Sequence, residues 1–518
     1  MRRQTQSRGS NSAARTSLSL ESSLPGRPTE AANQDLFISW HKKEPPTVQR
    51  KIQPMAEHFL KFEKRDLEFL KRAVGEANVS VEEPELLIHA VDSSPSEWVK
   101  PDAVVWPETT EQVSRILGYA NESRLPIVPR GAGSSLAGNV LPVSHGIVLN
   151  FRKMSSIVKI LDRDLQAVVQ PGLVYDKLNS ELQPYNLFFP PDPGSSSVCT
   201  IGGMVANNAS GMGAVKYGVT RDYVLKLEVV LPNGQIIRSG SNALKSSTGY
   251  DLVRLFVGSE GTLGVITEIT LKLRTLPAAM KTAVAYFDSV SAATEAVSEM
   301  MRSGLIPSAL EFLDHETILA VNRQEGLGLK ETAAMLLAEF HGTGDCTAHE
   351  LESALSILRK NGAVELHTAK DADERMRLWA GRKGAYPALA RSAPNPIIGD
   401  VVVPISKITA MVRFAYEAAA KYDVKLACFG HSGDGNVHPV VMADRSDKVL
   451  WERAARAVEE IVTYAISLGG VASGEHGIGV EKKRFMELQH GESLELMKSI
   501  KRLVDPNCIM NPGKIFDL

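Results

Sequence analysis

The order of apolar and polar positions along the chain predicts two halves of different architecture. Residues 55–75 place apolar side chains at helical spacing and end at Gly75, which predicts a helix with a glycine C-cap. From residue 101 to residue 273, short apolar stretches separated by Gly and Pro predict strands, with a hairpin turn at Asn233-Gly234. The first half is therefore expected to be rich in β-structure.

The second half predicts a regular exchange of strands and helices. Residues 283–287 are typical of a strand and residues 290–303 of an amphipathic helix. Residues 336–342, 347–360 and 364–368 repeat the order strand, helix, strand. We therefore expect an α+β arrangement in which helices cover an antiparallel sheet, followed by a polar helix near the C-terminus.

The composition is typical of a globular protein and excludes several classes. Hydrophobic residues make up 43% and charged residues 23% of the 518 residues. The 58 basic and 60 acidic side chains give a net charge of −2, so no basic field indicates nucleic-acid binding. No run of about 18 or more apolar residues predicts a membrane-spanning helix. Four distant cysteines without a CxxC pair argue against a disulfide scaffold, a zinc ribbon or an internal iron–sulfur cluster, and favour a reducing compartment.

The first 45 residues differ from the rest of the chain. Residues 1–20 contain four arginines and several serines but no acidic residue, and no apolar core follows them. This pattern excludes a secretory or twin-arginine signal. We predict a disordered tail on a cytoplasmic protein that reaches a membrane only through partners. The alternative is an organelle transit peptide, which would make the protein mitochondrial.

Clusters of glycine, serine and proline provide the first candidate chemistry. In residues 130–139, RGAGSSLAGN, glycines allow a ligand to approach the backbone closely, and successive N–H groups form a concavity that binds anions. The segment lacks the Lys-Ser/Thr ending of a P-loop, and the chain contains no GxGxxG fingerprint of an NAD site. Taken alone, such a segment is more often a tight turn. Three further clusters, at 190–197, 200–211 and 258–264, favour one long ligand that carries a diphosphate.

These motifs together resemble a known flavoprotein family. The order RGAGSSLAG, PDPGSS, TIGGMVANNASG, GSEGTLGVITE and NPGK is similar to the vanillyl-alcohol-oxidase-type (PCMH-type) FAD-binding domain. The second half resembles the FAD-linked oxidase domain of glycolate oxidase flavoprotein subunits and D-lactate dehydrogenases. The resemblance covers residues 100–518 and implies a non-covalent FAD with its diphosphate on residues 130–139. This loop contains neither the His nor the Cys that tethers the flavin in other members, and His145 is interpreted as a solvated residue.

The resemblance also divides the chain and assigns its cofactor contacts. It implies a two-domain α+β flavoprotein in which an FAD domain is joined to an α/β cap domain. The expected segments are a disordered tail (1–45), a helical segment (46–98), the FAD-binding domain (99–277), the substrate- and metal-binding cap (278–484) and a C-terminal segment that returns to the FAD domain (485–518). The expected FAD contacts are Arg130, Gly131, Ala132, Gly133, Ser134, Ser135, Gly138, Asn139, Pro193, Gly194, Ser195, Ser196, Gly202, Gly203, Asn208, Gly211, Glu260, Gly261, Gly264, Ile266 and Asn511.

The segment 431–438, HSGDGNVH, is the strongest chemical signal of the second half. Asp434-Gly435 is a favoured two-residue turn, and apolar flanks predict a strand on each side. In that register His431 and His438 lie directly opposite each other on one sheet face, where two imidazoles can share a metal ion. The alternative is a polar cross-strand pair on a solvated face.

The segment 474–479, GEHGIG, supplies groups that the hairpin lacks. Glycines on both sides allow the adjacent side chains of Glu475 and His476 to point in different directions, so Glu475 is a candidate third ligand and His476 a candidate general base. The resemblance implies the same roles. His431, His438 and Glu475 would hold one divalent ion, zinc, manganese or iron, and His476 would be the catalytic base.

Arg382, in the segment LWAGRKG, is a candidate clamp for a substrate carboxylate. A guanidinium group binds a carboxylate through two parallel hydrogen bonds, which lysine cannot reproduce. The sequence alone favours an arginine on a helix surface, whereas the resemblance assigns Arg382 to the substrate.

The resemblance implies FAD-dependent oxidation of a small D-2-hydroxy acid, D-lactate or glycolate, to the 2-oxo acid. Val440, Tyr386 and Ile398 stand where D-2-hydroxyglutarate dehydrogenases carry donors for a second carboxylate, which favours a monocarboxylate. Electrons would pass to oxygen or to a separate acceptor, for which iron–sulfur and second flavin-type subunits are candidates. The alternatives are a D-2-hydroxyglutarate-type dehydrogenase, a non-catalytic flavin-binding subunit of a larger oxidase complex and, on the same fold, alkylglycerone-phosphate synthase, whose run of histidines is absent here.

Overall fold

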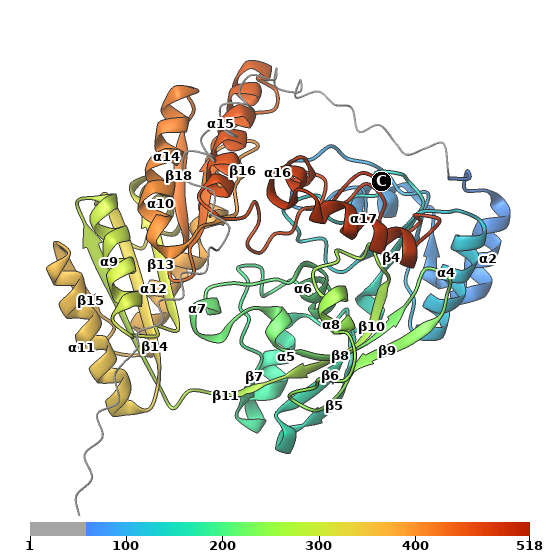
Figure 1. Ribbon diagram of the computed structural model, residues 1–518, viewed down its shortest axis with the longest axis horizontal. Helices are drawn as coiled ribbons and strands as arrows, with labels where there is room; N and C mark the ends of the chain where they lie inside the picture. The colour runs from blue at the N-terminus through green and yellow to red at the C-terminus, as the bar shows by residue number, and fades with distance from the viewer. Residues whose placement is uncertain (1–58) are drawn as a thin grey trace, which may run out of the picture. The chain divides into compact units, whose positions relative to one another are not determined.

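The computed structural model describes residues 59–518 (Figure 1). The predicted tail over residues 1–45, and with it the alternative of a transit peptide, lies outside the described residues, as does the start of the predicted segment 46–98. The helix predicted over residues 55–75 is found in part, as α2 (Lys64–Val74) with Gly75 as its C-cap, whereas residues 59–63 are not helical.

A mixed four-stranded sheet opens the described part of the chain. Its order is β1 (Val79–Ser80), β2 (Ala103–Val105), β4 (Ile147–Asn150) and β3 (Ile127–Arg130), with β1 antiparallel and the other strands parallel to one another. Apolar side chains of α2 and of α4 (Thr110–Glu122) form one core with this sheet. Beyond β1, the short helix α3 (Glu83–Ile88) follows.

A five-stranded antiparallel sheet follows, as the alternating apolar stretches predict. Its strands are, in spatial order, β5 (Ile157–Leu161), β6 (Gln166–Val169), β10 (Val265–Lys272), β8 (Val224–Val230) and β9 (Ile236–Gly240). The predicted hairpin turn at Asn233-Gly234 joins β8 to β9.

Four helices and a two-stranded ladder complete this part of the molecule. Three helices bury their apolar faces on the five-stranded sheet: α5 (Tyr175–Leu182), α6 (Ile201–Asn207) and α8 (Leu252–Phe256). Helix α7 (Ala214–Tyr217) lies in the same stretch of chain, and β7 (Leu187–Phe188) pairs with β11 (Arg274–Thr275).

The second half is built on an eight-stranded antiparallel sheet. Seven of its strands follow the order β15 (Glu365–Thr368), β12 (Ala279–Phe287), β14 (Ala334–Gly342), β13 (Ala309–Asp314), β18 (Leu426–His431), β19 (Asn436–Val441) and β16 (Ile397–Ile398). The eighth, β17 (Val401–Val402), also pairs with β19. The strands predicted over residues 283–287, 336–342 and 364–368 are all found in this sheet.

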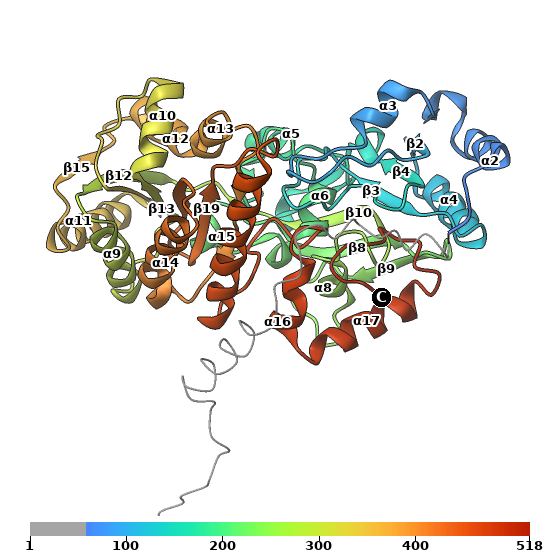
Figure 2. The same cartoon turned by 90° about the horizontal axis from the view of Figure 1, so that it is seen from above.

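Helices cover both faces of this sheet (Figure 2). One face carries α9 (Val290–Arg302), α11 (Gly344–Lys360), α14 (Ile408–Lys421) and α15 (Lys448–Ser467). The other face carries α10 (His315–Glu325), α12 (Ala372–Lys383) and α13 (Ala385–Ala390). Alternate residues of β12 enter the two cores, as period-two side-chain geometry requires. The predicted α+β class is confirmed.

The C-terminal segment returns to the first sheet. After α16 (Met486–His490) and α17 (Ser493–Val504), Met510 forms a bridge with Ile127 of β3, and the N–H of Asn511 donates to the Ile127 carbonyl at 2.7 Å. No helix within residues 59–518 has the length and apolar character needed to cross a membrane.

Candidate active site

A cavity of about 420 Å³ lies between the glycine-rich loops of the first half and the eight-stranded sheet of the second. All five residues predicted to act on the substrate or hold a metal line it: Arg382, His431, His438, Glu475 and His476. Sixteen of the expected FAD contacts line it as well: Arg130, Gly131, Ala132, Gly133, Ser134, Ser135, Asn139, Pro193, Gly194, Ser195, Gly202, Gly203, Glu260, Gly261, Gly264 and Ile266. One wall therefore carries the candidate chemistry and another the candidate cofactor cradle.

The remaining five expected FAD contacts, Gly138, Ser196, Asn208, Gly211 and Asn511, do not line the cavity. The side chains of two of them, Asn208 and Asn511, instead form hydrogen bonds with the main chain of the segments around the cavity. Asn208 caps α6 in the left-handed conformation and accepts a hydrogen bond from the Arg221 N–H at 2.9 Å. The Asn511 side chain donates to the Asn139 carbonyl at 2.9 Å and the Glu260 carbonyl at 2.6 Å. Their role as direct FAD contacts stays a prediction.

The cradle depends on close approach between the loop 130–139 and the start of α6. A Cβ atom at Gly131 would lie 2.2 Å from the hydroxyl of Thr200, the residue that caps α6. A side chain at Gly131 would therefore separate the two segments. The guanidinium of Arg130 points away from this approach and donates to the Val91 carbonyl at 2.8 Å. Arg130 thus lines the cavity while its side chain secures the loop.

The histidine hairpin is present, but its predicted register is wrong. Strand β18 ends at His431 and strand β19 begins at Asn436, so four residues rather than two connect them. His438 pairs with Phe429 instead of His431. The loop is wider because it is tethered to strand β13, where the Leu310 carbonyl accepts from the N–H of Gly433 at 3.1 Å. Because the register differs by two residues, both imidazoles keep the same sheet face, with ring centroids 5.2 Å apart.

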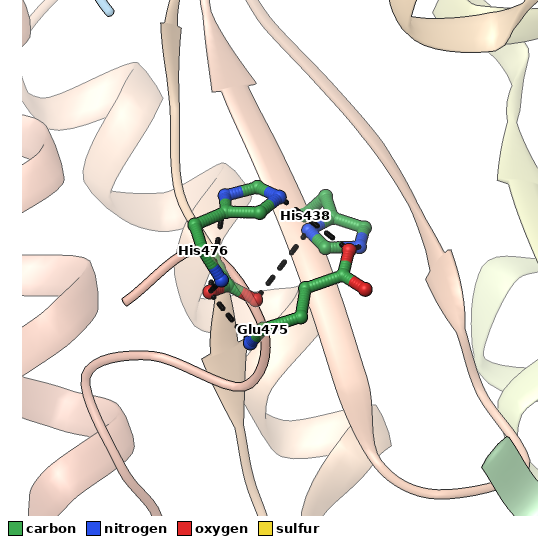
Figure 3. A group of neighbouring side chains, drawn as sticks. His438, Glu475 and His476 are labelled. Atoms are coloured by element: carbon green, nitrogen blue, oxygen red, sulfur yellow. Dashed lines mark hydrogen bonds and ion pairs between the residues drawn. The ribbon is translucent and has the colours of Figure 1, made fainter. Parts of the chain in front are cut away.

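Three imidazoles converge on one carboxylate oxygen of Glu475, and Figure 3 shows two of them, His438 and His476. Oε1 of Glu475 lies 3.6 Å from Nε2 of His431 and 3.4 Å from Nε2 of both His438 and His476. His438 projects from β19, whereas Glu475 and His476 belong to the loop after α15. His476 therefore lies as close to the carboxylate as the two predicted ligand histidines.

Glu311 is a functional candidate that the sequence analysis missed. It lies opposite His431 on the neighbouring strand β13, is fully buried, and its carboxylate is 2.9 Å from Nδ1 of His431. The same carboxylate accepts from Nε of Arg382 at 2.5 Å. Burial opposes a charge on His431, but Glu311 and Glu475 outweigh it and raise the pKa of His431 to about 10. Glu311 thus orients one candidate ligand and the candidate substrate clamp together.

Asp400 was also missed, and it anchors the loop that carries Glu475 and His476. Its Oδ2 accepts from the N–H groups of Gly474 at 3.0 Å, Glu475 at 3.1 Å and His476 at 2.9 Å. The Nζ of Lys482 lies 3.2 Å from the same oxygen. Burial alone would raise the pKa of Asp400, but the positive charges around it hold the pKa well below its usual range.

Asp400 lies beside the candidate ligands, and ligand atoms of Asp400, His438, Glu475 and His476 all lie within 4.8 Å of one another. Its oxygens are 3.9 Å from Nδ1 of His438 and 3.8 Å from Nδ1 of His476, whereas the Nε2 atoms point to Glu475. We therefore interpret Asp400 as an anchor rather than a metal ligand. An acidic residue among apolar neighbours was the sequence signal in both cases: Asp400 within the stretch 397–403, and Glu311 between Leu310 and Phe312.

Comparison with known proteins identifies the family. Residues 101–240 match the FAD binding domain family, and residues 276–515 match the family of FAD linked oxidases, C-terminal domain. Glycolate oxidase subunit GlcD of Bacillus subtilis is 43% identical over 83% of this chain and 92% of its own length. The mitochondrial D-lactate dehydrogenase (cytochrome) of Arabidopsis thaliana is 39% identical over 80% of this chain and 73% of its own length.

The chain belongs to the FAD-linked oxidase family. It is therefore an FAD-binding oxidoreductase, which confirms the predicted cofactor and enzyme class. The structure of p-cresol methylhydroxylase with bound substrate superimposes with a TM-score of 0.73 at 19% identity, covering 88% of this chain and 96% of that one. This likeness confirms the predicted PCMH-type fold of the FAD-linked oxidase.

Proposed function

We propose that this FAD-linked oxidase converts a small D-2-hydroxy acid, D-lactate or glycolate, into the 2-oxo acid. The observation that carries the proposal is the convergence of three imidazoles, Glu475 and Arg382 on the cavity that the glycine-rich loops also line. The names of the two relatives, a glycolate oxidase subunit and a D-lactate dehydrogenase, support the same substrate class.

We further propose that His431, His438 and Glu475 hold one divalent metal ion, zinc, manganese or iron. Ligand atoms about 2.0–2.2 Å from a common tetrahedral ion are roughly 3.3–3.6 Å apart, and the oxygen-to-nitrogen distances to His431 and His438 are 3.6 and 3.4 Å. Burial lowers the pKa of His438 to about 3, which keeps it in the neutral form that binds metals. The elevated pKa of His431 reflects surplus negative charge that a cation would balance. When bound, such an ion supplies Lewis acidity to the substrate hydroxyl.

His476 is the proposed base for the hydroxyl proton of the substrate. Its side chain is 12% exposed on the cavity wall, and its buried Nδ1 has no hydrogen-bond partner among residues 59–518. FAD, when bound, would accept the hydrogen on Cα of the substrate together with the two electrons. His476 would hold the proton while the loop backbone, secured by Asp400, keeps its imidazole directed at the cavity.

Arg382 is the proposed clamp for the substrate carboxylate. Its Nε donates to Glu311, its Nη2 lies 3.3 Å from Nδ1 of His431, and its guanidinium carbon lies 4.9 Å from the centre of the Phe429 ring on the cavity wall. A nearby lysine, Lys383, is also on the wall but lies 3.5 Å from the Asp192 carboxylate. Tyr386, also on the wall, gives this end of the cavity an apolar surface that suits a monocarboxylate.

Arg382→Lys is expected to lower kcat/KM by about 10- to 100-fold, mainly through a higher KM. Lysine offers a single point charge, so one charge-assisted hydrogen bond, worth about 1.5–3 kcal/mol, is lost. Steady-state kinetics with D-lactate and glycolate measure the effect. Arg377→Lys, an exposed change on the same helix, is the matched control and should leave both constants unchanged. An equal kcat/KM in the two variants would exclude Arg382 as the clamp.

The substrate class is tested by anaerobic bleaching of the bound flavin. We expect D-lactate or glycolate to bleach the flavin at least about tenfold faster than D-2-hydroxyglutarate, because Tyr386 and Ile398 on the cavity wall offer no cationic donor to a second carboxylate. Faster bleaching by the dicarboxylate would instead favour a D-2-hydroxyglutarate-type dehydrogenase. A flavin that dithionite bleaches but no hydroxy acid does would indicate a non-catalytic flavin-binding subunit.

Removal of the metal is tested in the same assay. Dialysis against a chelator is expected to slow bleaching at least about tenfold, and zinc, manganese or iron should restore it. Unchanged bleaching in a metal-free protein would disprove the metal site.

We propose that the electrons then leave the flavin to a separate acceptor, an iron–sulfur or second flavin-type subunit, because the Bacillus subtilis relative is a subunit of an oxidase.

A further inference from the structure

Glu260 lies at the meeting point of the FAD cradle and the loop of the candidate base. Its side chain is 6% exposed, and both carboxylate oxygens accept hydrogen bonds. Oε1 accepts from the N–H of Ile478 at 2.6 Å, and Oε2 accepts from the N–H of Gly479 at 2.8 Å. The side chain of Asn139 also donates to Oε2, at 2.7 Å. Glu260 is an expected FAD contact, yet its carboxylate accepts hydrogen bonds from groups of the protein itself.

Four separate sequence motifs meet around Glu260. Glu260 belongs to GSEGTLG, Asn139 ends the loop 130–139, and Ile478 belongs to GEHGIG. Asn511, of the terminal NPGK, donates to the main-chain carbonyls of both Glu260 and Asn139. Glu260 itself has a φ of 51°, a left-handed conformation that a non-glycine residue adopts only when its surroundings hold it.

The contact between the loop and Glu260 is tight. A Cβ atom on Gly477 would lie 2.6 Å from the Asn139 amide nitrogen and 2.8 Å from Oε1 of Glu260. The segment 474–479 is therefore held between two buried carboxylates: Asp400 binds the N–H groups of residues 474–476, and Glu260 binds those of residues 478 and 479. Glu475 and His476 belong to the part that Asp400 binds, and only Gly477 separates them from the part that Glu260 binds, so a displacement at Glu260 is expected to shift them.

We propose that Glu260 is a positioning residue for the reaction, which fixes the loop of Glu475 and His476 to the FAD-binding half of the molecule. This inference rests on the proposed function, since it assigns a consequence to the placement of His476. The alternative is that Glu260 acts only as an FAD contact. All three donors to its carboxylate are protein N–H groups, which favours the positioning role.

Comparison of Glu260→Gln with Glu228→Gln separates these roles. Glutamine keeps the shape of the side chain but places an NH2 group against donors, so the loop loses at least one contact. Glu228 is the matched control: it is 7% exposed, accepts from the hydroxyls of Thr110 and Thr267, and does not line the cavity. Both variants remove one buried carboxylate from the same part of the fold.

Glu260→Gln is expected to keep FAD at wild-type stoichiometry, yet a hydroxy acid should bleach its flavin at least about tenfold more slowly, since small displacements of reacting groups are costly. Dithionite should bleach it normally, and Glu228→Gln should stay within about twofold of the wild type. Loss of FAD, with a normal bleaching rate once FAD is added in excess, would show a cofactor contact and overturn the proposal. Equal slowing in both variants would overturn it too, because the effect would then be general.

Amide hydrogen exchange over residues 474–480 gives a readout that needs no substrate. Exchange in the loop should be at least about tenfold faster in Glu260→Gln than in the wild type and unchanged in Glu228→Gln. An unaltered loop would contradict the proposal. If no hydroxy acid bleaches even the wild type, the proposed function fails, while the exchange result still decides the role of Glu260. If Glu260→Gln does not fold, Glu260→Asp, which withdraws the carboxylate by one methylene, is measured by the same criteria.

Discussion

Replacement of His476 by alanine is expected to reduce turnover of the hydroxy acid on the order of 10²-fold or more. Of the three imidazoles, His431 and His438 belong to β-strands, whereas His476 belongs to a loop. The main-chain N–H of His476 donates to Asp400 at 2.9 Å. The glycine-rich cradle for FAD is formed by other segments, so the visible spectrum of the bound flavin should not change. Anaerobic stopped-flow measurement of flavin reduction reports the step directly, without the contribution of the electron acceptor.

The same variant decides between two roles for His476. A base contributes to the rate but not to metal affinity, so His476→Ala should retain the metal content of the wild type. Because Nε2 of His476 lies 3.4 Å from Glu475, as does Nε2 of His438, a role as a metal ligand is the competing interpretation. Loss of metal together with activity would support that interpretation. His349→Ala, an exposed change on α11, should affect neither quantity.

Local sequence patterns predicted the secondary structure because a helix or a turn depends mainly on residues within its own segment. The spacing of apolar residues in 290–303 and the Asn233-Gly234 dipeptide depend on neighbours a few positions away, and the structure confirms both. The register of the histidine hairpin was wrong for the opposite reason. A contact between Gly433 and Leu310, more than 120 residues earlier in the chain, widens the loop, and no local pattern contains it.

The same distinction explains which site residues the sequence revealed. His431, His438, Glu475 and His476 stand in short motifs rich in glycine, and all four line the cavity. Glu311 and Asp400 have apolar residues or glycine as direct neighbours, and their partners come from distant segments. A buried carboxylate needs donors or a positive charge nearby, so each of these isolated acids implied partners that the sequence could not identify.

Asp400→Ala is expected to reduce turnover on the order of 10²-fold and to lower the free energy of unfolding by about 3–5 kcal/mol. The change leaves three consecutive buried N–H groups of the loop, and the ammonium of Lys482, without their acceptor. Freed of this anchor, Glu475 is no longer held near the imidazoles, so the metal content should fall as well. Urea denaturation, metal analysis and flavin reduction measure the three effects.

Two further variants show whether the effect of Asp400 is specific to the loop. Asp314→Ala removes another fully buried carboxylate of the same sheet, which accepts from the N–H of Cys428 and the hydroxyl of Tyr416, both at 2.7 Å. It should cost similar stability but much less activity. Asp400→Asn retains one oxygen for the loop amides and should recover part of the turnover. If Asp400→Ala and Asp314→Ala lose equal stability and equal activity, Asp400 stabilises the fold without positioning the base, because of these two carboxylates it is Asp400 that binds the N–H groups of residues 474–476.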